Sequence, residues 1–269
     1  MDTALQHFSI KDRVLQRLLL RVRPAALGSL LKKRLGVQRS VITTDAGKFY
    51  VDPVSGFGAL LTQGSYEPGL VVAMWSLLEP GGCFVDVGAN EGYFSVIASK
   101  LVGASGRVLA IEPQQRLRSV LDTNFELNRV TNVEIVDVAV SDHRGSATLH
   151  LSPDTNTGST ALQQSTSYRT AQSTIETVTL EELLASRGIE RVDLLKMDVE
   201  GFEYEAILGS PELFRRHVVR AIAIELHPRA LVTRNHSCEE ILAFLKGHGY
   251  RLDLRFEHNT INSVWTAQG

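Results

Sequence analysis

Apolar residues along the chain are spaced so that short buried strands alternate with amphipathic helices from Gly82 onward. Continuous apolar runs predict the strands, and apolar residues at helical spacing predict the helices between them. The predicted strands are residues 83–87, 107–111, 133–138, 192–197 and 221–226, with a hairpin over residues 41–51. The predicted helices are residues 70–78, 92–101, 114–128, 202–208 and 238–248. Strands joined by helical crossovers are typical of a mostly parallel, doubly wound α/β sheet.

The end of the chain and one internal segment depart from this alternation. Residues 250–254 and 260–266 predict an antiparallel pair that closes the sheet. Residues 147–151 are strand-like, whereas residues 152–173 are rich in Ser, Thr, Asn and Gln. A long polar segment of this kind predicts an exposed loop, which we expect over the cofactor or beside the acceptor. Residues 179–186 then predict a helix that begins with a capping box.

The N-terminal segment differs from the rest in pattern and charge. Residues 9–35 place leucines near helical spacing with basic residues between them, and Pro24 is expected to divide this helix in two. Residues 1–39 contain nine Lys or Arg and two Asp, a net of +7, whereas the remainder contains 19 basic and 28 acidic residues, a net of −9. We therefore predict a basic helical extension, residues 1–40, and one main domain, residues 41–269.

The basic extension and the acidic main domain suggest different partners. A basic amphipathic helix can lie on an anionic membrane or cover a partner. We favour a helix that packs on its own domain with its basic face in water, and we keep peripheral membrane contact by residues 1–39 as the alternative. A nucleic-acid partner is not expected, because the main domain is acidic and has no basic patch interleaved with aromatic residues. A homodimer is compatible with the sequence.

The two cysteines and the hydropathy of the chain indicate a cytoplasmic protein. Cys83 and Cys238 lack the spacing of a zinc site or a disulfide framework, so both are expected to be free thiols. No apolar run is long enough for a membrane-spanning helix. Basic residues interrupt the start of the chain, which excludes the continuous apolar core of a signal peptide.

Candidate chemistry begins at the loop after the first strand of the main domain. Gly88 and Gly92 allow a tight turn and a close approach to a ligand, but the spacing Gly88-x-Asn90-x-Gly92 is not that of a dinucleotide loop. Asp86 and Glu91 bring negative charge, which disfavours a pyrophosphate. The same charge suits a ligand with a sulfonium and an amino group. Taken alone, the loop is equally consistent with a structural turn.

The next two strand ends also carry ligand-type side chains. Glu112 ends its strand twenty residues after Gly92, where a carboxylate can accept hydrogen bonds from both ribose hydroxyls. Because NAD sites share this feature, it indicates an adenosine ligand without specifying which. Asp137 ends the third predicted strand, where it is the natural candidate to meet the amino group of an adenine.

Four stretches of the chain resemble the FkbM family of S-adenosylmethionine-dependent methyltransferases. They are residues 85–94, 111–113, 138–142 with Gly145, and 195–203, with minor likenesses at residues 66–67, 156–159 and 224–227. The resemblance covers roughly residues 64–249. It implies a seven-stranded, Rossmann-like methyltransferase sheet with an antiparallel final strand, and O-methylation of a hydroxyl on a sugar, glycan or natural product.

The resemblance also assigns roles to individual residues. It implies that S-adenosylmethionine contacts Asp86, Gly88, Asn90, Gly92, Glu112, Asp137 and Val138. From their places in the loop and at a strand end, we expect Glu91, Tyr93 and Asp198 to contact it as well. The acceptor is expected beside a second set: Tyr66, Glu67, Asn156, Ser159 and Glu225. Two positions depart from the family pattern, since Glu91 and Met197 stand where an apolar residue and Ile are common.

The fourth and fifth strands end in the candidate catalytic groups Asp198, Glu200, His227 and Lys196. Asp198 is expected to contact the cofactor or the acceptor. Glu200 is a candidate to orient the acceptor, act as a base or bind a divalent cation, and His227 is a candidate general base. Each has a structural alternative, such as an ion pair of Lys196 with Asp198 or Glu225. A site for Mg²⁺ is conceivable here, but no dedicated spacing predicts a metal.

Two other functions compete with O-methylation. An NAD-dependent oxidoreductase explains Glu112 but not the acids in the glycine loop or the block 196–201. A non-catalytic adapter would bind a partner or membrane through the basic helix, and it would be expected to carry damaged cofactor motifs. Within the methyltransferase class, an amine acceptor needs less help from a base than a hydroxyl does.

Overall fold

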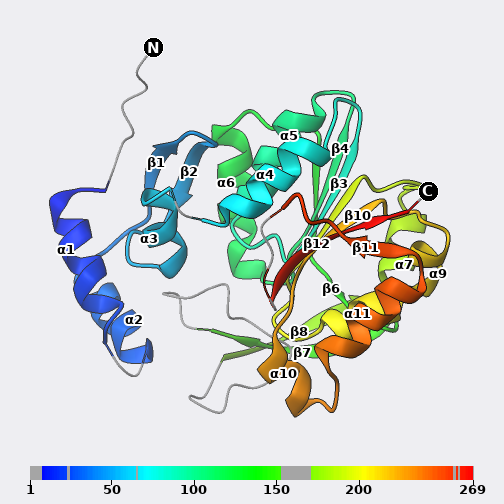
Figure 1. The fold of residues 1–269 in the computed structure, drawn as a ribbon. Coiled ribbons are helices and arrows are strands. Elements are labelled where there is room, and N and C mark those ends of the chain that lie inside the picture. Colours follow the sequence, from blue (N-terminus) through cyan, green and yellow to red (C-terminus); the bar gives the residue numbers. More distant parts are fainter. Residues whose placement is uncertain are drawn as a thin grey trace.

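A seven-stranded sheet runs through the main domain of the computed structural model, in the order β11-β12-β10-β9-β3-β4-β5 (Figure 1). The structure describes residues 8–22, 25–64, 66–152, 171–256, 259 and 261–268. The strands are β3 (Cys83–Val87), β4 (Arg107–Ile111), β5 (Val133–Val136), β9 (Leu194–Met197), β10 (Ala221–Glu225), β11 (Tyr250–Leu252) and β12 (Asn262–Ala267). Strands β5, β4, β3, β9 and β10 are parallel, and β12 is antiparallel to both β10 and β11. This confirms the expected fold.

Helices cover both faces of the sheet (Figure 1). Successive residues of a strand point to opposite faces, so Phe84 packs with Met74 and Phe94 while Val85 packs with Leu184 and Phe214. The first face is covered by α4 (Pro68–Leu77), α5 (Tyr93–Val102) and α6 (Arg118–Leu127), and the second by α7 (Leu180–Ala185), α8 (Glu203–Leu208), α9 (Pro211–Arg215) and α11 (Cys238–Gly247). The central strands are buried on both sides, which explains their continuous apolar sequence.

The order of the strands creates a switch point between β3 and β9. From β3 the chain builds outward through β4 to β5, and it then returns to add β9 and β10 on the other side of β3. In an open α/β sheet, ligands bind at the carboxyl ends of the strands beside such a point. The glycine loop after β3 and the residues after β9 therefore face the same crevice.

A small three-stranded sheet, in the order β6-β8-β7, lies beside the main one. It contains β6 (Ala139–Val140), β7 (Gly145–Leu151) and β8 (Ala171–Val178), around a core of Ala139, Leu149 and Ile175. Two predictions fail here. Strand β5 ends at Val136, before residues 137–138, and the expected loop ends earlier than predicted because β8 already begins at Ala171. The rest of that loop lies outside the described residues.

The N-terminal segment forms α1 (Ile10–Leu19), α2 (Ala25–Arg34), the hairpin β1 (Ser40–Thr44) and β2 (Gly47–Val51), and α3 (Gly56–Thr62). The two helices and the hairpin agree with the predictions, whereas α3, α9 and α10 (Pro228–Thr233) were missed. Both α9 and α10 begin with a proline, which starts a helix as readily as it stops a strand.

The extension contacts the main domain through some side chains of both helices and leaves others exposed. Phe8 and Leu19 are buried, and the side chain of Gln16 donates a hydrogen bond to the carbonyl of Pro53. Val14 and Leu18 remain exposed on α1 among basic residues. Peripheral membrane contact and the domain boundary at residue 40 stay predictions. Among the described helices, none combines the length and apolar character needed to cross a bilayer.

The packing of α7 against the sheet predicts a large difference between two identical substitutions. Leu184 in α7 is 0% exposed, whereas Leu254 is 73% exposed. Leu184→Ala is expected to lower the free energy of unfolding by about 3–5 kcal/mol through lost burial and a cavity. Leu254→Ala is expected to change it by less than about 0.5 kcal/mol. Equilibrium denaturation in urea measures both, and equal effects would contradict the described core.

Candidate functional site

Lys196, on β9, holds together the two strand ends that form the crevice. Its ammonium donates a hydrogen bond to the carbonyl of Gly88 at 2.7 Å and lies 3.6 Å from Asp86 and 3.5 Å from Asp198. Burial alone would lower the pKa of Lys196, but the charges of Asp198, Asp86 and further acids outweigh it and raise the pKa above its usual value. Lys196 is therefore charged and cannot accept a proton. The geometry favours the structural ion pair over a catalytic role.

Asp86 is the buried counterpart of Lys196 on β3. It is 0% exposed, and its Oδ2 accepts a hydrogen bond from Ser95 at 2.6 Å. Burial raises the pKa of Asp86, while Lys196 and the Ser95 hydroxyl oppose the shift. The carboxylate thus balances Lys196 and is not among the described residues that line either cavity of the site.

The glycine loop passes directly over the end of β9. Gly88 has φ +81°, and a Cβ at this position would lie 1.9 Å from the carbonyl oxygen of Asp198. Asn90 also adopts the left-handed conformation, with φ +49°, and its N–H donates to Glu112 at 2.7 Å. Only glycine fits at position 88, since any side chain would push the two strand ends apart.

An inner cavity lies between this loop and the ends of β4 and β5. Five expected cofactor residues line it, namely Gly88, Asn90, Glu112, Val138 and Asp198, together with the catalytic candidate Glu200. The oxygens of Glu112 accept hydrogen bonds from the N–H groups of Asn90, at 2.7 Å, and Gln114, at 2.9 Å. Burial raises the pKa of Glu112, and these hydrogen bonds oppose the shift. The carboxylate is held at the wall of this cavity, whose volume is about 60 Å³, so the chemistry of the lining suits a ribose hydroxyl.

An outer cavity of about 330 Å³ lies on the other side of Asp198. Its charged lining residues are Glu67, Lys196, Asp198 and Glu225. Burial raises the pKa of Glu67 to about 7, and the nearby acids add to this shift although Lys196 opposes it. Burial likewise raises the pKa of Glu225. With Lys196 already paired, the outer cavity is acidic.

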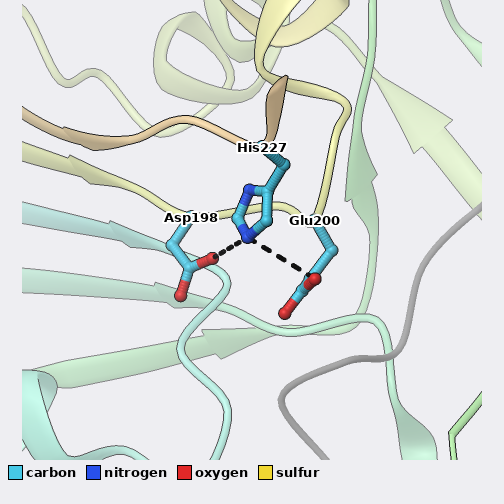
Figure 2. Close-up of side chains that lie close together, drawn as sticks. All are labelled: Asp198, Glu200 and His227. Atoms are coloured by element: carbon cyan, nitrogen blue, oxygen red, sulfur yellow. Dashed lines mark ion pairs between the residues drawn. The ribbon is translucent and has the colours of Figure 1, made fainter. Parts of the chain in front are cut away.

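His227 follows β10 and meets carboxylates from three positions. Its Nδ1 lies 2.9 Å from Glu203, and its Nε2 lies 3.5 Å from Glu200 and 3.9 Å from Asp198 (Figure 2). Burial alone would lower the pKa of His227, but the hydrogen bond to Glu203 and the charges of all three carboxylates raise it to about 9. At neutral pH the imidazole is protonated in this state, so it is not free to act as the expected general base.

Several predicted site residues have other partners. Glu91 accepts two hydrogen bonds from Arg39, each 2.8 Å long, so its charge is balanced within the protein. Asp137 pairs with Arg118 at 3.1 Å. Tyr66 and Tyr93 contact each other edge to face, with ring centroids 5.4 Å apart. None of these residues, nor Gly92, is among the described residues lining the cavities.

Other residues of the site were missed or cannot be placed. Asn156 and Ser159 lie outside the described residues. The unpredicted lining includes Gln114, Val140, Leu149 and Phe202 in the inner cavity and Asn259, Asn262 and Ser263 in the outer one. Gln114 follows the quoted motif 111–113 directly, so that signal was available. Val140 and Phe202 also lie inside quoted motifs, 138–142 and 195–203. Leu149 comes from the small sheet, and Asn259, Asn262 and Ser263 come from the closing strand β12 and the turn before it, which carry no motif.

A family model described as "Methyltransferase FkbM domain" matches residues 86–252, more than half of the chain. "31-O-demethyl-FK506 methyltransferase FkbM" of Streptomyces tacrolimicus is 29% identical over 200 residues, which cover 64% of this chain and 74% of that protein. "Methyltransferase sdnD" of Sordaria araneosa is 28% identical over 169 residues, covering 52% and 64% respectively.

Two further matches cover different shares of the relative's own length. "AMB antimetabolite synthetase AmbE" of Pseudomonas aeruginosa is 26% identical over 241 residues, which cover 75% of this chain but only 11% of that protein. The crystal structure of "Methyltransferase FkbM" from Methylobacillus flagellatus KT matches with a TM-score of 0.43 and 13% identity, over 95% of this chain and 59% of that one.

The contact between Gly88 and Asp198 predicts that Gly88→Ala weakens S-adenosylmethionine binding at least tenfold, about 1.4 kcal/mol. The added methyl group must displace the Asp198 carbonyl from the cavity wall. Gly188→Ala is the matched control, because Gly188 also has positive φ, +61°, but nothing lies within 4 Å of a Cβ there. Isothermal titration calorimetry measures both. Equal affinities for the two variants would show that the close approach is irrelevant.

The ion pair between Arg39 and Glu91 predicts that the protein loses stability when Arg39 is replaced. Arg39→Ala leaves the Glu91 carboxylate, whose side chain is 0% exposed, without its partner. The free energy of unfolding is expected to fall by about 3 kcal/mol, and the added change Glu91→Gln is expected to recover part of the loss. Arg17→Ala, at an exposed position of α1, serves as the control. Absence of recovery in the double variant would contradict the buried-charge explanation of the loss.

Proposed function

The chain belongs to the FkbM methyltransferase family, and on that premise we propose that it methylates a hydroxyl of a sugar, glycan or natural-product acceptor. S-adenosylmethionine is the methyl donor. One observation carries the proposal: the inner and outer cavities share Asp198 as a wall. A donor in one cavity and an acceptor in the other meet at this residue, so binding alone brings the reacting atoms together.

The inner cavity is the proposed donor site. Glu112 would hold the ribose, Gly88 and Asn90 the amino-acid part, and Val138 the adenine. When bound, S-adenosylmethionine supplies a methyl group made electrophilic by its sulfonium. Asp198 and the acids beyond it give the meeting point a negative charge, which favours a cationic sulfonium over a pyrophosphate. This is the feature that disfavours the NAD-dependent alternative.

The outer cavity is the proposed acceptor site. Its acidic lining by Glu67, Asp198 and Glu225 favours neutral or cationic acceptors over phosphorylated ones. Asn262 also lines it, and Oδ1 of this amide is buried without a hydrogen-bond partner among the described residues. A hydroxyl of the acceptor can satisfy that oxygen. The name of the Streptomyces tacrolimicus relative specifies 31-O-demethyl-FK506, which supports an oxygen acceptor.

Glu67 is the proposed proton acceptor for that hydroxyl. A general base works best when its pKa lies near the working pH, and the pKa of Glu67 is raised to about 7. Its carboxylate lines the outer cavity, where the hydroxyl would lie. The carboxylates around His227 raise its pKa to about 9 and lie beside both ring nitrogens, so His227 is not the proposed base.

Donor binding and turnover test this function. Calorimetry with the full chain should show binding of S-adenosylmethionine and no binding of NAD. Turnover is followed as S-adenosylhomocysteine formed with a panel of neutral polyhydroxylated compounds, with their phosphorylated forms as controls. Binding of NAD alone would overturn the assignment of the inner cavity. A preference for phosphorylated acceptors would overturn the assignment of the outer one.

Glu67→Gln predicts a change in the pH profile. A base must be deprotonated, so the wild-type rate should rise as pH increases through about 7 and fall away below it. The variant should lose that rise and turn over about 100-fold more slowly at pH 8 or above. Glu79→Gln, at an exposed position just after α4, is the control. A Glu67→Gln profile parallel to that of the wild type would exclude Glu67 as the base.

A further inference from the structure

Three side chains converge where the two cavities meet, and together they have the composition of a metal site. Asp198, Glu200 and His227 each offer a ligand atom, and these atoms lie within 4.8 Å of one another. Figure 2 shows the imidazole between the two carboxylates, with its Nε2 directed at both of them. Asp198 and Glu200 follow β9, and His227 follows β10, so the sheet itself fixes their separation.

The oxygen of Asp198 that faces His227 is distinct from the one that faces Lys196. Oδ2 lies 3.5 Å from the Lys196 ammonium, whereas Oδ1 lies 3.9 Å from Nε2 of His227. The ion pair with Lys196 therefore orients the carboxylate and leaves Oδ1 available as a ligand. The side chains of Asp198, Glu200 and His227 are 23%, 27% and 21% exposed, so an ion can enter.

A fourth residue supports the imidazole from behind. Glu203 is 0% exposed, and its Oε1 lies 2.9 Å from Nδ1 of His227. A buried carboxylate on one ring nitrogen fixes the ring and directs the other nitrogen toward a metal, as is common among metal-binding histidines. Oε2 of Glu203 is itself buried and has no hydrogen-bond partner among the described residues. The buried negative charge at this site therefore exceeds what its protein partners satisfy, and a cation would compensate it.

We propose that Asp198, Glu200 and His227 bind a divalent cation, with Glu203 as a positioning residue. One imidazole nitrogen and two carboxylate oxygens suit a cation such as Mn²⁺, which accepts both ligand types. The cation takes the place of the proton that Nε2 carries in its absence, and that proton is released to solvent. Three protein ligands leave coordination positions open toward the cavities. An oxygen of the acceptor can occupy one of them, a detail that rests on the proposed function, whereas binding of the cation does not.

Electron paramagnetic resonance of free Mn²⁺ tests the proposal on the chelator-treated full chain, without S-adenosylmethionine or acceptor. The wild type should bind one equivalent of Mn²⁺. Asp198→Asn, Glu200→Gln and His227→Gln should each weaken binding at least tenfold. The exposed pair Asp142 and His143, 2.6 Å apart, provides the control, because the double change Asp142→Asn and His143→Gln should leave binding unchanged.

Glu203→Gln distinguishes a positioned imidazole from a loose cluster of charges. This variant keeps all three ligands and should weaken Mn²⁺ binding by about 10–100-fold. If it fails to fold, as judged by circular dichroism, Glu203→Asp carries the test, because it keeps the buried charge and all three ligands but shortens the reach to Nδ1 of His227. Absence of Mn²⁺ binding to the wild type, or equal loss in the Asp142 and His143 control, would overturn the proposal. Because donor binding is measured separately, failure of the cation site is distinct from failure of the methyltransferase assignment.

Discussion

The buried ammonium of Lys196 is the interaction on which the rest of the site depends. It connects the carboxylate of Asp86 inside β3, the carbonyl of Gly88 in the following loop and the carboxylate of Asp198 after β9. These elements lie on either side of the point where strand order reverses. Removing one partner from such a buried set costs about 3–5 kcal/mol, since the remaining charges stay buried without compensation. The loop can approach this closely only because Gly88 has no side chain.

This constraint explains why the site is divided in two. Lys196 holds the glycine loop against Asp198. This contact divides the crevice at the switch point into an inner cavity lined by Glu112 and an outer cavity lined by Glu67 and Glu225. The acids outnumber the cations there. Two of the acids, Glu67 and Glu200, have positive φ, as does Asn90 in the glycine loop. Backbone strain of this kind persists where the surroundings hold it in place, and it commonly marks functional positions.

The sequence predicted the parts of this arrangement that depend on local pattern. Apolar runs located the strands of the main sheet, and strand ends located Gly88, Glu112 and Asp198, because chain direction alone brings such residues to one edge.

The sequence did not predict contacts between segments that are distant along the chain. Glu91 was expected at the cofactor, but its partner Arg39 comes from the N-terminal segment, 52 residues earlier. The raised pKa of His227 depends on Glu203, and no sequence pattern places the Glu203 carboxylate beside Nδ1 of this imidazole. Strand β8 was missed because residues 171–178 are mostly polar and do not alternate regularly, so they resemble the polar segment before them.

The central claim is that donor and acceptor occupy separate cavities on the two sides of Asp198. A crystal structure of the chain with S-adenosylhomocysteine tests it most directly. We predict that the ribose hydroxyls lie within hydrogen-bond distance of Glu112, and that the sulfur lies beside Asp198 at the boundary with the outer cavity. A nucleoside bound in the outer cavity, between Glu67 and Glu225, would contradict it.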